Sequence, residues 1–262
     1  IVYLYCKFKN SSIMRKMFFP FALLLLSGMA FTSCSQDEEI VAESPVMRDY
    51  QTDAQILSKF VDINRSTDEY YINENKRTSV MSYLTDNDWL ELKKVSPANY
   101  QRFEKGLQEL NDQLQAYAKD PEISKIVYST YGGETYVKEL NHDCPTEIEK
   151  AKYDMPLSRA TYQSISLSSF VKSGFASFTA GSTIHTNIQI ISFGYYLVEL
   201  KCNTSGAECT NNHSSGLVLS GTSSTGYVAY TWTSGSASTF WDFTATGRTL
   251  SSGASVQINF TD

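Results

Sequence analysis

The spacing of hydrophobic and polar positions changes along this chain. Before about Arg159, apolar residues recur three and four positions apart, which is the spacing of one face of an α-helix. After it, short runs alternate apolar and polar residues and are separated by Gly and Ser, as in β-strands joined by turns. The pattern predicts an α+β protein: a helical region over residues 51–158, then an antiparallel β-sandwich of the jelly-roll or immunoglobulin-like kind over residues 159–262.

The clearest predicted helix follows Ser96, because serine caps a helix and the next residue, Pro97, suits its first position. Its apolar stripe fits an intramolecular core face, and consists of Phe103, Leu107, Leu110, Leu114 and Tyr117. Other helices are predicted after Asp53 as a cap, after Thr85 with a capping box to Asp88, and around residues 123–127.

Eight strands are predicted in the second region, near residues 161–170, 173–180, 184–193, 195–202, 215–220, 226–233, 238–246 and 254–260. Alternation places Trp241 and Phe243 on one face of their strand. The order of the strands does not follow from the pattern.

The beginning of the chain has the pattern of an export signal. Residues 1–13 are interpreted as upstream read-through, because the first methionine, Met14, is followed at once by Arg15 and Lys16. The apolar run from Met17 to Met29 is shorter than the roughly 20 residues that cross a bilayer. Residues 14–33 are therefore predicted to be a cleaved signal peptide.

The next residues, Phe31-Thr32-Ser33-Cys34, resemble the lipobox of bacterial lipoproteins, with Phe31 in place of the usual leucine. The resemblance implies that Cys34 is lipidated and becomes the first residue of the mature chain. Residues 34–50 are a predicted linker, and the acidic run Asp37-Glu38-Glu39 is similar to the tether of Bacteroidota surface lipoproteins. This implies an outer-membrane lipoprotein that is exposed at the cell surface, and it implies nothing about the domains that follow.

The charge balance excludes some partners. The formal net charge is −6, and the four basic residues before Cys34 would leave the mature chain near −10. Such a balance disfavours nucleic acid, which is bound through its phosphates. It also disfavours a polybasic membrane patch, so the predicted membrane contact is the lipid on Cys34.

Two cysteines are candidates for a disulfide. Cys202 and Cys209 flank a turn-rich stretch, and a hairpin there would bring them close enough to bond outside the cytoplasm. Whether the bond forms is left open. Cys144 is predicted to remain a free thiol.

No catalytic motif is found. His142, Asp143 and Cys144 are consecutive, and a nucleophile, its base and an orienting group seldom converge from such a run, so this stretch is interpreted as a loop. No zinc spacing is present, and Glu91 replaces the glycine of a calcium loop. We therefore expect no metal, no cofactor and no enzymatic activity.

The function predicted from these observations is non-catalytic binding or adhesion, with a glycan or a surface protein as the candidate partner. Tyr227 and Trp241 are the candidate ligand-binding residues, because aromatic rings stack on sugars and anchor interfaces. For Trp241 a place in the core is the alternative. A structural subunit of a surface assembly, favoured by an unpaired edge strand, also stays open. So does a hydrolase, favoured by a raised pKa at Glu199 or Asp242 beside a second carboxylate.

Overall fold

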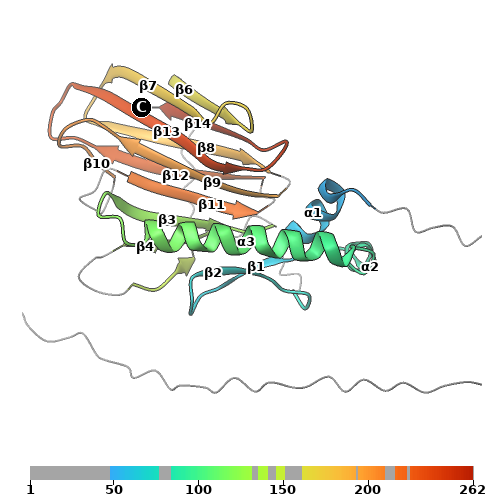
Figure 1. The fold of residues 1–262 in the computed structure, drawn as a ribbon. Helices are drawn as coiled ribbons and strands as arrows, with labels where there is room; N and C mark the ends of the chain where they lie inside the picture. The colour runs from blue at the N-terminus through green and yellow to red at the C-terminus, as the bar shows by residue number, and fades with distance from the viewer. Residues whose placement is uncertain are drawn as a thin grey trace, which may run out of the picture. The chain divides into compact units, whose positions relative to one another are not determined.

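The computed structural model describes residues 48–76, 84–131, 135–140, 146–150, 161–192, 194–209, 216–222 and 225–261. Residues 47–262 form one compact unit, which is mostly β and contains several antiparallel sheets (Figure 1). No helix among the described residues is long and apolar enough to cross a membrane. The predicted signal peptide, Cys34 and most of the tether lie outside the described residues, as does the run from His142 to Cys144.

Two large sheets form the body of the molecule. The first has the order β10-β12-β8-β14-β6. Its strands are β6 (Thr161–Ser168), β8 (Thr183–Ile191), β10 (Glu208–Cys209), β12 (Thr225–Thr233) and β14 (Ser255–Thr261). The second has the order β5-β4-β3-β11-β9-β13-β7. Its strands are β3 (Ile123–Ser129), β4 (Thr135–Glu139), β5 (Glu149–Lys150), β7 (Ser173–Ala180), β9 (Tyr195–Cys202), β11 (Gly216–Thr222) and β13 (Thr239–Leu250). Within both sheets neighbours are antiparallel, except that β3 and β11 run parallel.

The main hydrophobic core is built from alternate residues of both sheets. Ile188 and Ile258 of the five-stranded sheet belong to the same buried cluster as Val198 and Phe243 of the seven-stranded sheet. The rings of Phe243 and Phe260 lie 4.4 Å apart between their centroids. Period-two alternation along each strand supplies one apolar face to each sheet, and the two faces pack together.

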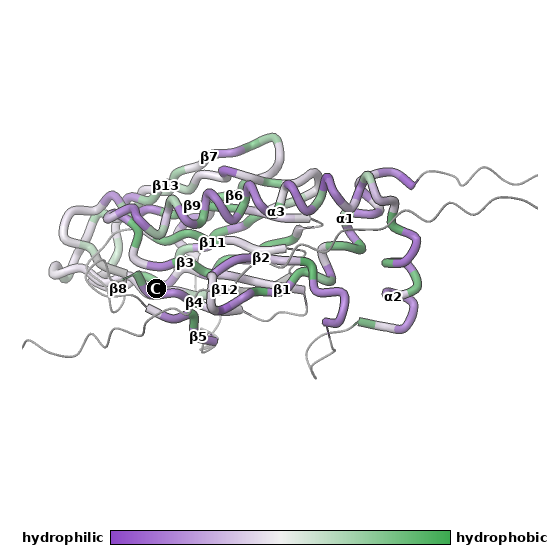
Figure 2. Tube along the Cα trace, turned by 60° about the horizontal axis from the view of Figure 1, so that its bottom comes forward, coloured by the Kyte–Doolittle hydropathy of each residue, from purple (hydrophilic) through white to green (hydrophobic). Residues whose placement is uncertain are grey.

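A second core lies on the other face of the seven-stranded sheet. There α3 (Pro97–Tyr117) packs with α1 (Tyr50–Lys59) and with the hairpin of β1 (Val61–Asn64) and β2 (Glu69–Ile72). Hydrophilic and hydrophobic residues alternate along α3 as it turns (Figure 2). Leu107 and Leu110 of its apolar stripe are buried with Leu197 and Val218 of the sheet. The prediction that this stripe is a core face is confirmed.

The helix caps explain where the helices begin. Ser96 caps α3 by accepting a hydrogen bond from the Asn99 N–H, and Thr85 with Asp88 forms the predicted capping box of α2 (Asp86–Leu92). The predicted cap at Asp53 is wrong, because α1 starts earlier and Asp49 caps it. Asp53 is instead fully buried, and its carboxylate accepts the N–H of Ser96 at 3.1 Å, which joins α1 to the start of α3.

The predicted helix over residues 123–127 is also wrong. This segment is β3, whose seven residues are all buried, and it pairs with β11. Both faces of the strand are covered, since Val127 belongs to the core between the sheets and Ile126 to the core under α3. Ile123, Ile126 and Val127 lie three and four positions apart, which is helical spacing, and a strand buried on both faces need not alternate apolar and polar residues.

The helical region predicted over residues 51–158 is thus a mixture of helices and strands. Strands from both sides of Arg159 lie in the seven-stranded sheet, so the two predicted parts share one sheet. Beyond Arg159, all eight predicted strands are found at closely similar positions, and the two-residue β10 was missed.

Candidate functional site

Trp241, a predicted ligand contact, has no exposed surface. Its ring stacks on Phe243 with centroids 5.9 Å apart, and its indole N–H donates to the Gly181 carbonyl oxygen at 2.9 Å. The prediction that Trp241 contacts a ligand is therefore wrong, and the alternative place in the core is the correct one. Trp232 is fully buried as well, with its ring against the edge of Phe243.

Tyr227, the other candidate, lies in β12, where its backbone pairs with Gln189 of β8. Its side chain is outside the described residues, so its role in ligand binding stays a prediction.

The two cysteines of the proposed disulfide end up in different sheets. Cys202 ends β9 in the seven-stranded sheet, and Cys209 ends β10 in the five-stranded sheet, so they are not the two arms of one hairpin. Cys202 is buried, and burial raises the pKa of its thiol. The side chain of Cys209 is outside the described residues, so the bond stays a prediction.

An exposed aromatic ring adjoins the buried Trp241. Phe240 is 63% exposed, because strand alternation turns Trp241 and Phe243 inward and Phe240 outward. The sequence analysis placed Trp241 and Phe243 on one face of the strand, but it did not note that Phe240 must then lie on the opposite face. The signal that identifies the exposed ring was therefore present in the pattern.

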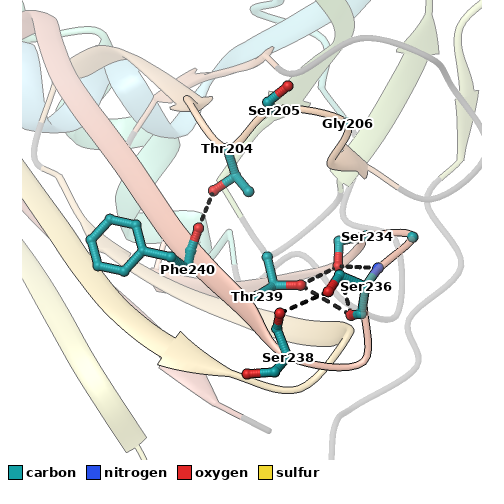
Figure 3. A pocket seen from close by; sticks show the side chains of 9 residues that line it. Thr204, Ser205, Gly206, Ser234, Ser236, Ser238, Thr239 and Phe240 are labelled. Atoms are coloured by element: carbon teal, nitrogen blue, oxygen red, sulfur yellow. Dashed lines mark hydrogen bonds between the residues drawn. The ribbon is translucent and has the colours of Figure 1, made fainter.

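Beside Phe240 lies an open hollow lined by small hydroxyl-bearing residues, with a volume of about 500 Å³ (Figure 3). One wall is the turn after β9, with Thr204, Ser205 and Gly206. The other is the turn between β12 and β13, with Ser234–Gly235–Ser236 and Ser238 leading into Thr239. The Phe240 ring lies on the other side of its strand from these serines (Figure 3), so it flanks the hollow and does not cover it.

Most hydroxyls of the hollow hold the turns in place. Ser236 donates to the Ser238 carbonyl at 2.8 Å, and Thr239 donates to the Ser236 carbonyl at 3.1 Å. Thr204 donates to the Phe240 carbonyl at 3.1 Å and accepts the Asp242 N–H at 2.8 Å, which ties the two walls together. Figure 3 shows no such bond for the exposed side-chain hydroxyls of Ser205 and Ser238. These two hydroxyls are therefore available to a ligand.

Glu199 does not have the environment of a catalytic acid. Burial raises its pKa, but hydrogen bonds from Arg248, Lys201 and Tyr117 outweigh that effect and lower it overall. Arg248 Nη2 lies 2.8 Å from one carboxylate oxygen, and Lys201 Nζ lies 3.0 Å from the other. The raised pKa that would have favoured a hydrolase at Glu199 is not found.

The other acidic candidate, Asp242, faces outward next to Phe240. Its carboxylate accepts a hydrogen bond from the Ser177 hydroxyl at 2.8 Å. Among the described residues no group of three or more His, Cys, Asp or Glu side chains is arranged to hold a metal ion. Neither observation indicates a catalytic site around Asp242.

Comparisons with protein-family models, with curated proteins and with solved structures found no match to this chain.

Proposed function

We propose that this chain is a surface-exposed outer-membrane lipoprotein, anchored through Cys34, whose jelly-roll or immunoglobulin-like sandwich is a non-catalytic glycan-binding module. The observation that carries the proposal is the hydroxyl-lined hollow flanked by the exposed Phe240 ring. Sugars present apolar C–H faces and many hydroxyls. A surface that combines an aromatic ring with small polar groups complements both.

The place of the hollow in the fold supports the proposal. Its walls come from the end of β9 and the start of β13, while the chain enters the described fold at α1, at the other end of these strands (Figure 1). A tether attached before α1 would leave the hollow at the end of the sandwich away from the attachment. That end is accessible to ligands outside the cell.

A glycan array with soluble protein from Ser35 onward tests the proposal. We expect specific binding that is lost in Phe240→Ala and weakened in the double variant Ser205→Ala/Ser238→Ala. Tyr71→Ala is the matched control, because Tyr71 is an exposed aromatic residue on β2, in the hairpin under α3. Binding that survives both site variants, or no binding to any glycan, would reject the hollow as a glycan site.

The anchor has its own test. We expect radioactive palmitate to label the full chain in bacterial cells and not the Cys34→Ser variant. Protease treatment of intact cells should then degrade the labelled protein if it is exposed at the surface. Labelling of Cys34→Ser would reject the predicted anchor.

A structural subunit of a surface assembly is the second candidate, and the two edge strands β6 and β7 favour it. Each has eight residues without any charge or proline, whereas the opposite edge strands β5 and β10 have two residues each. Long uncharged edges are the ones that add strands from other chains.

The same side of the molecule carries two exposed aromatic residues. Phe175 is 75% exposed, and Phe170 in the β6–β7 turn is 96% exposed. Gln163 of β6 partly blocks this edge, since its side-chain oxygen accepts the Ser177 N–H at 2.8 Å.

Cross-linking in cells separates the two candidates. A photo-reactive residue at Phe175 that captures a defined envelope protein, together with no glycan binding, would move the structural role to first place.

A further inference from the structure

A second cavity lies between the helices and the seven-stranded sheet, at the other end of the strands that form the hollow. It has a volume of about 320 Å³ and is lined by α1, α3, the start of β9 and the end of β13. Leu250 at this cavity and Phe240 at the hollow are ten residues apart along β13, or roughly 33 Å at strand spacing. The cavity is therefore a separate site, and no residue lines both.

Aromatic rings form the apolar part of the cavity. Phe103 is fully buried and meets the half-buried Tyr195 edge to face, with ring centroids 5.8 Å apart. Tyr50 forms another part of the lining. Burial raises the pKa of its hydroxyl to about 12. The cavity thus offers flat apolar walls with phenolic hydroxyls between them.

A glycine in the middle of α3 makes room for one of these rings. A Cβ atom at Gly106 would lie 2.1 Å from the Tyr195 hydroxyl oxygen and 2.6 Å from its ring carbon Cζ. Glycine inside a helix costs about 1 kcal/mol relative to alanine. The position of Tyr195 against α3 is thus kept at the expense of helix stability.

Arg102 supplies a cation at the mouth of the cavity. Its guanidinium carbon lies 3.8 Å from the centre of the Tyr50 ring, so the ring holds the side chain in place. Within the described part of the chain, no carboxylate or carbonyl accepts a hydrogen bond from this guanidinium. A stacked guanidinium with free N–H groups is suited to grip a carboxylate with two parallel hydrogen bonds.

We propose that this cavity is a binding site for a small organic carboxylate with a ring-sized body. The carboxylate pairs with Arg102, and the ring lies against Tyr50 and Tyr195. Ser252 and Gln51, both exposed at the rim, supply further polar contacts for substituents on the ring. The cavity is large enough to hold one ring with its carboxylate.

Titration monitored by protein amide NMR tests this site with two matched pairs of probes. Benzoate is compared with benzyl alcohol, and glucuronate with glucose, so that each pair differs in the carboxylate while the ring stays of one kind. We expect one or both carboxylates to shift amide signals of residues around the cavity, and the neutral partners to bind at least about tenfold more weakly. The pair that responds tells whether the ring is aromatic or a sugar.

Variants locate the effect. Arg102→Gln should weaken carboxylate binding about tenfold or more, and Arg102→Lys should restore only part of it because lysine lacks the planar fork. The control is Arg65→Gln, since Arg65 is an exposed arginine in the β1–β2 turn. Equal binding of charged and neutral probes, unchanged binding in Arg102→Gln, or no shifts at about 10 mM probe would overturn the proposal. None of these results depends on glycan binding at the hollow, which Phe240→Ala tests separately.

Discussion

The outer face of the seven-stranded sheet has a covered half and an open half. Under α3, the outward residues Leu197 and Val218 are completely buried. On β7 and β13 the outward residues Phe175 and Phe240 are 75% and 63% exposed. Alternation along the strands is the same in both halves. Whether an outward residue becomes core or surface is therefore decided by the element that lies over it, and not by its own strand.

The covered half carries mostly apolar outward residues and the open half mostly polar ones, with Phe175 and Phe240 as the two exceptions on the open half. The covered half presents aliphatic and tyrosine side chains to the helical layer, whereas the open half presents Ser177, Asp242 and Thr244 around the two phenylalanines. Single exposed apolar residues are ordinary on protein surfaces. Phe240 differs from that case because it flanks the hollow, which is why it and not the buried Trp241 carries the proposed function.

The sharpest test of this comparison uses the neighbours Trp241 and Phe240. Trp241→Ala should lower the free energy of unfolding by about 3–5 kcal/mol, because it leaves a large cavity in the main core. Phe240→Ala should change it by no more than about 0.5 kcal/mol, because its ring is mostly in solvent. Urea unfolding followed by circular dichroism measures both. Similar losses in the two variants would mean that β13 does not alternate as described.

The covered half is tested by Leu110→Ala. Leu110 is buried between α3 and the sheet, so truncation should cost about 2–5 kcal/mol. Phe175→Ala on the open half is the control and should cost about 0.5 kcal/mol or less. A small loss for Leu110→Ala would show that α3 is not fixed on the sheet.

Sequence alone predicted α3 because its apolar stripe runs from Phe103 to Tyr117 and both ends of the helix carry clear signals. It also located the later strands, whose alternation and Gly-Ser turns are repeated many times. It failed at β3, where seven consecutive buried residues show no period, and at Asp53, whose partners Ser96 and Asn99 are distant in sequence. Local patterns predict elements, but a strand covered on both faces looks the same as a short helix.

The candidate sites were less predictable than the elements. Phe240 follows from alternation once Trp241 is assigned to the core. The aromatic cavity is different, because Tyr50, Arg102, Tyr195 and Leu250 come from four separate segments. No spacing along the chain indicates that they meet. Which half of the sheet α3 covers is likewise a property of the tertiary arrangement.

The contact between α3 and the Tyr195 ring of β9 is tested at Gly106. Gly106→Ala gains about 1 kcal/mol of helix propensity but forces the Tyr195 ring to move, which typically costs about 1–3 kcal/mol. We expect a net loss of up to roughly 2 kcal/mol in thermal and urea unfolding. In a Tyr195→Ala background the same change should become stabilising, because the clash is gone. A stabilising Gly106→Ala in the wild-type background would contradict the described contact.

The smallest effect is expected at the border between the two halves. There Tyr117 at the end of α3, Glu199 on β9 and Arg248 on β13 meet, and the Tyr117 hydroxyl donates to Glu199 at 2.9 Å. Arg248→Ala should lower stability by about 1 kcal/mol, because the guanidinium is half exposed while Glu199 is buried. Lys105→Ala, which removes an exposed ion pair with Glu109 on α3, is the control and should cost about 0.5 kcal/mol or less.

The same cluster predicts a pH dependence with a definite sign. Because the folded pKa of Glu199 lies below the ordinary value of 4.5, its stabilising effect is present above pH 4.5 and is lost as the pH falls through the folded pKa. The stability of the wild type should therefore fall more steeply below pH 4.5 than that of Glu199→Gln, which has no carboxylate to protonate. Urea midpoints measured between pH 7 and pH 3 compare the two slopes. Parallel slopes would show that Glu199 titrates alike in the folded and unfolded chain, which would contradict the ion pairs described for it.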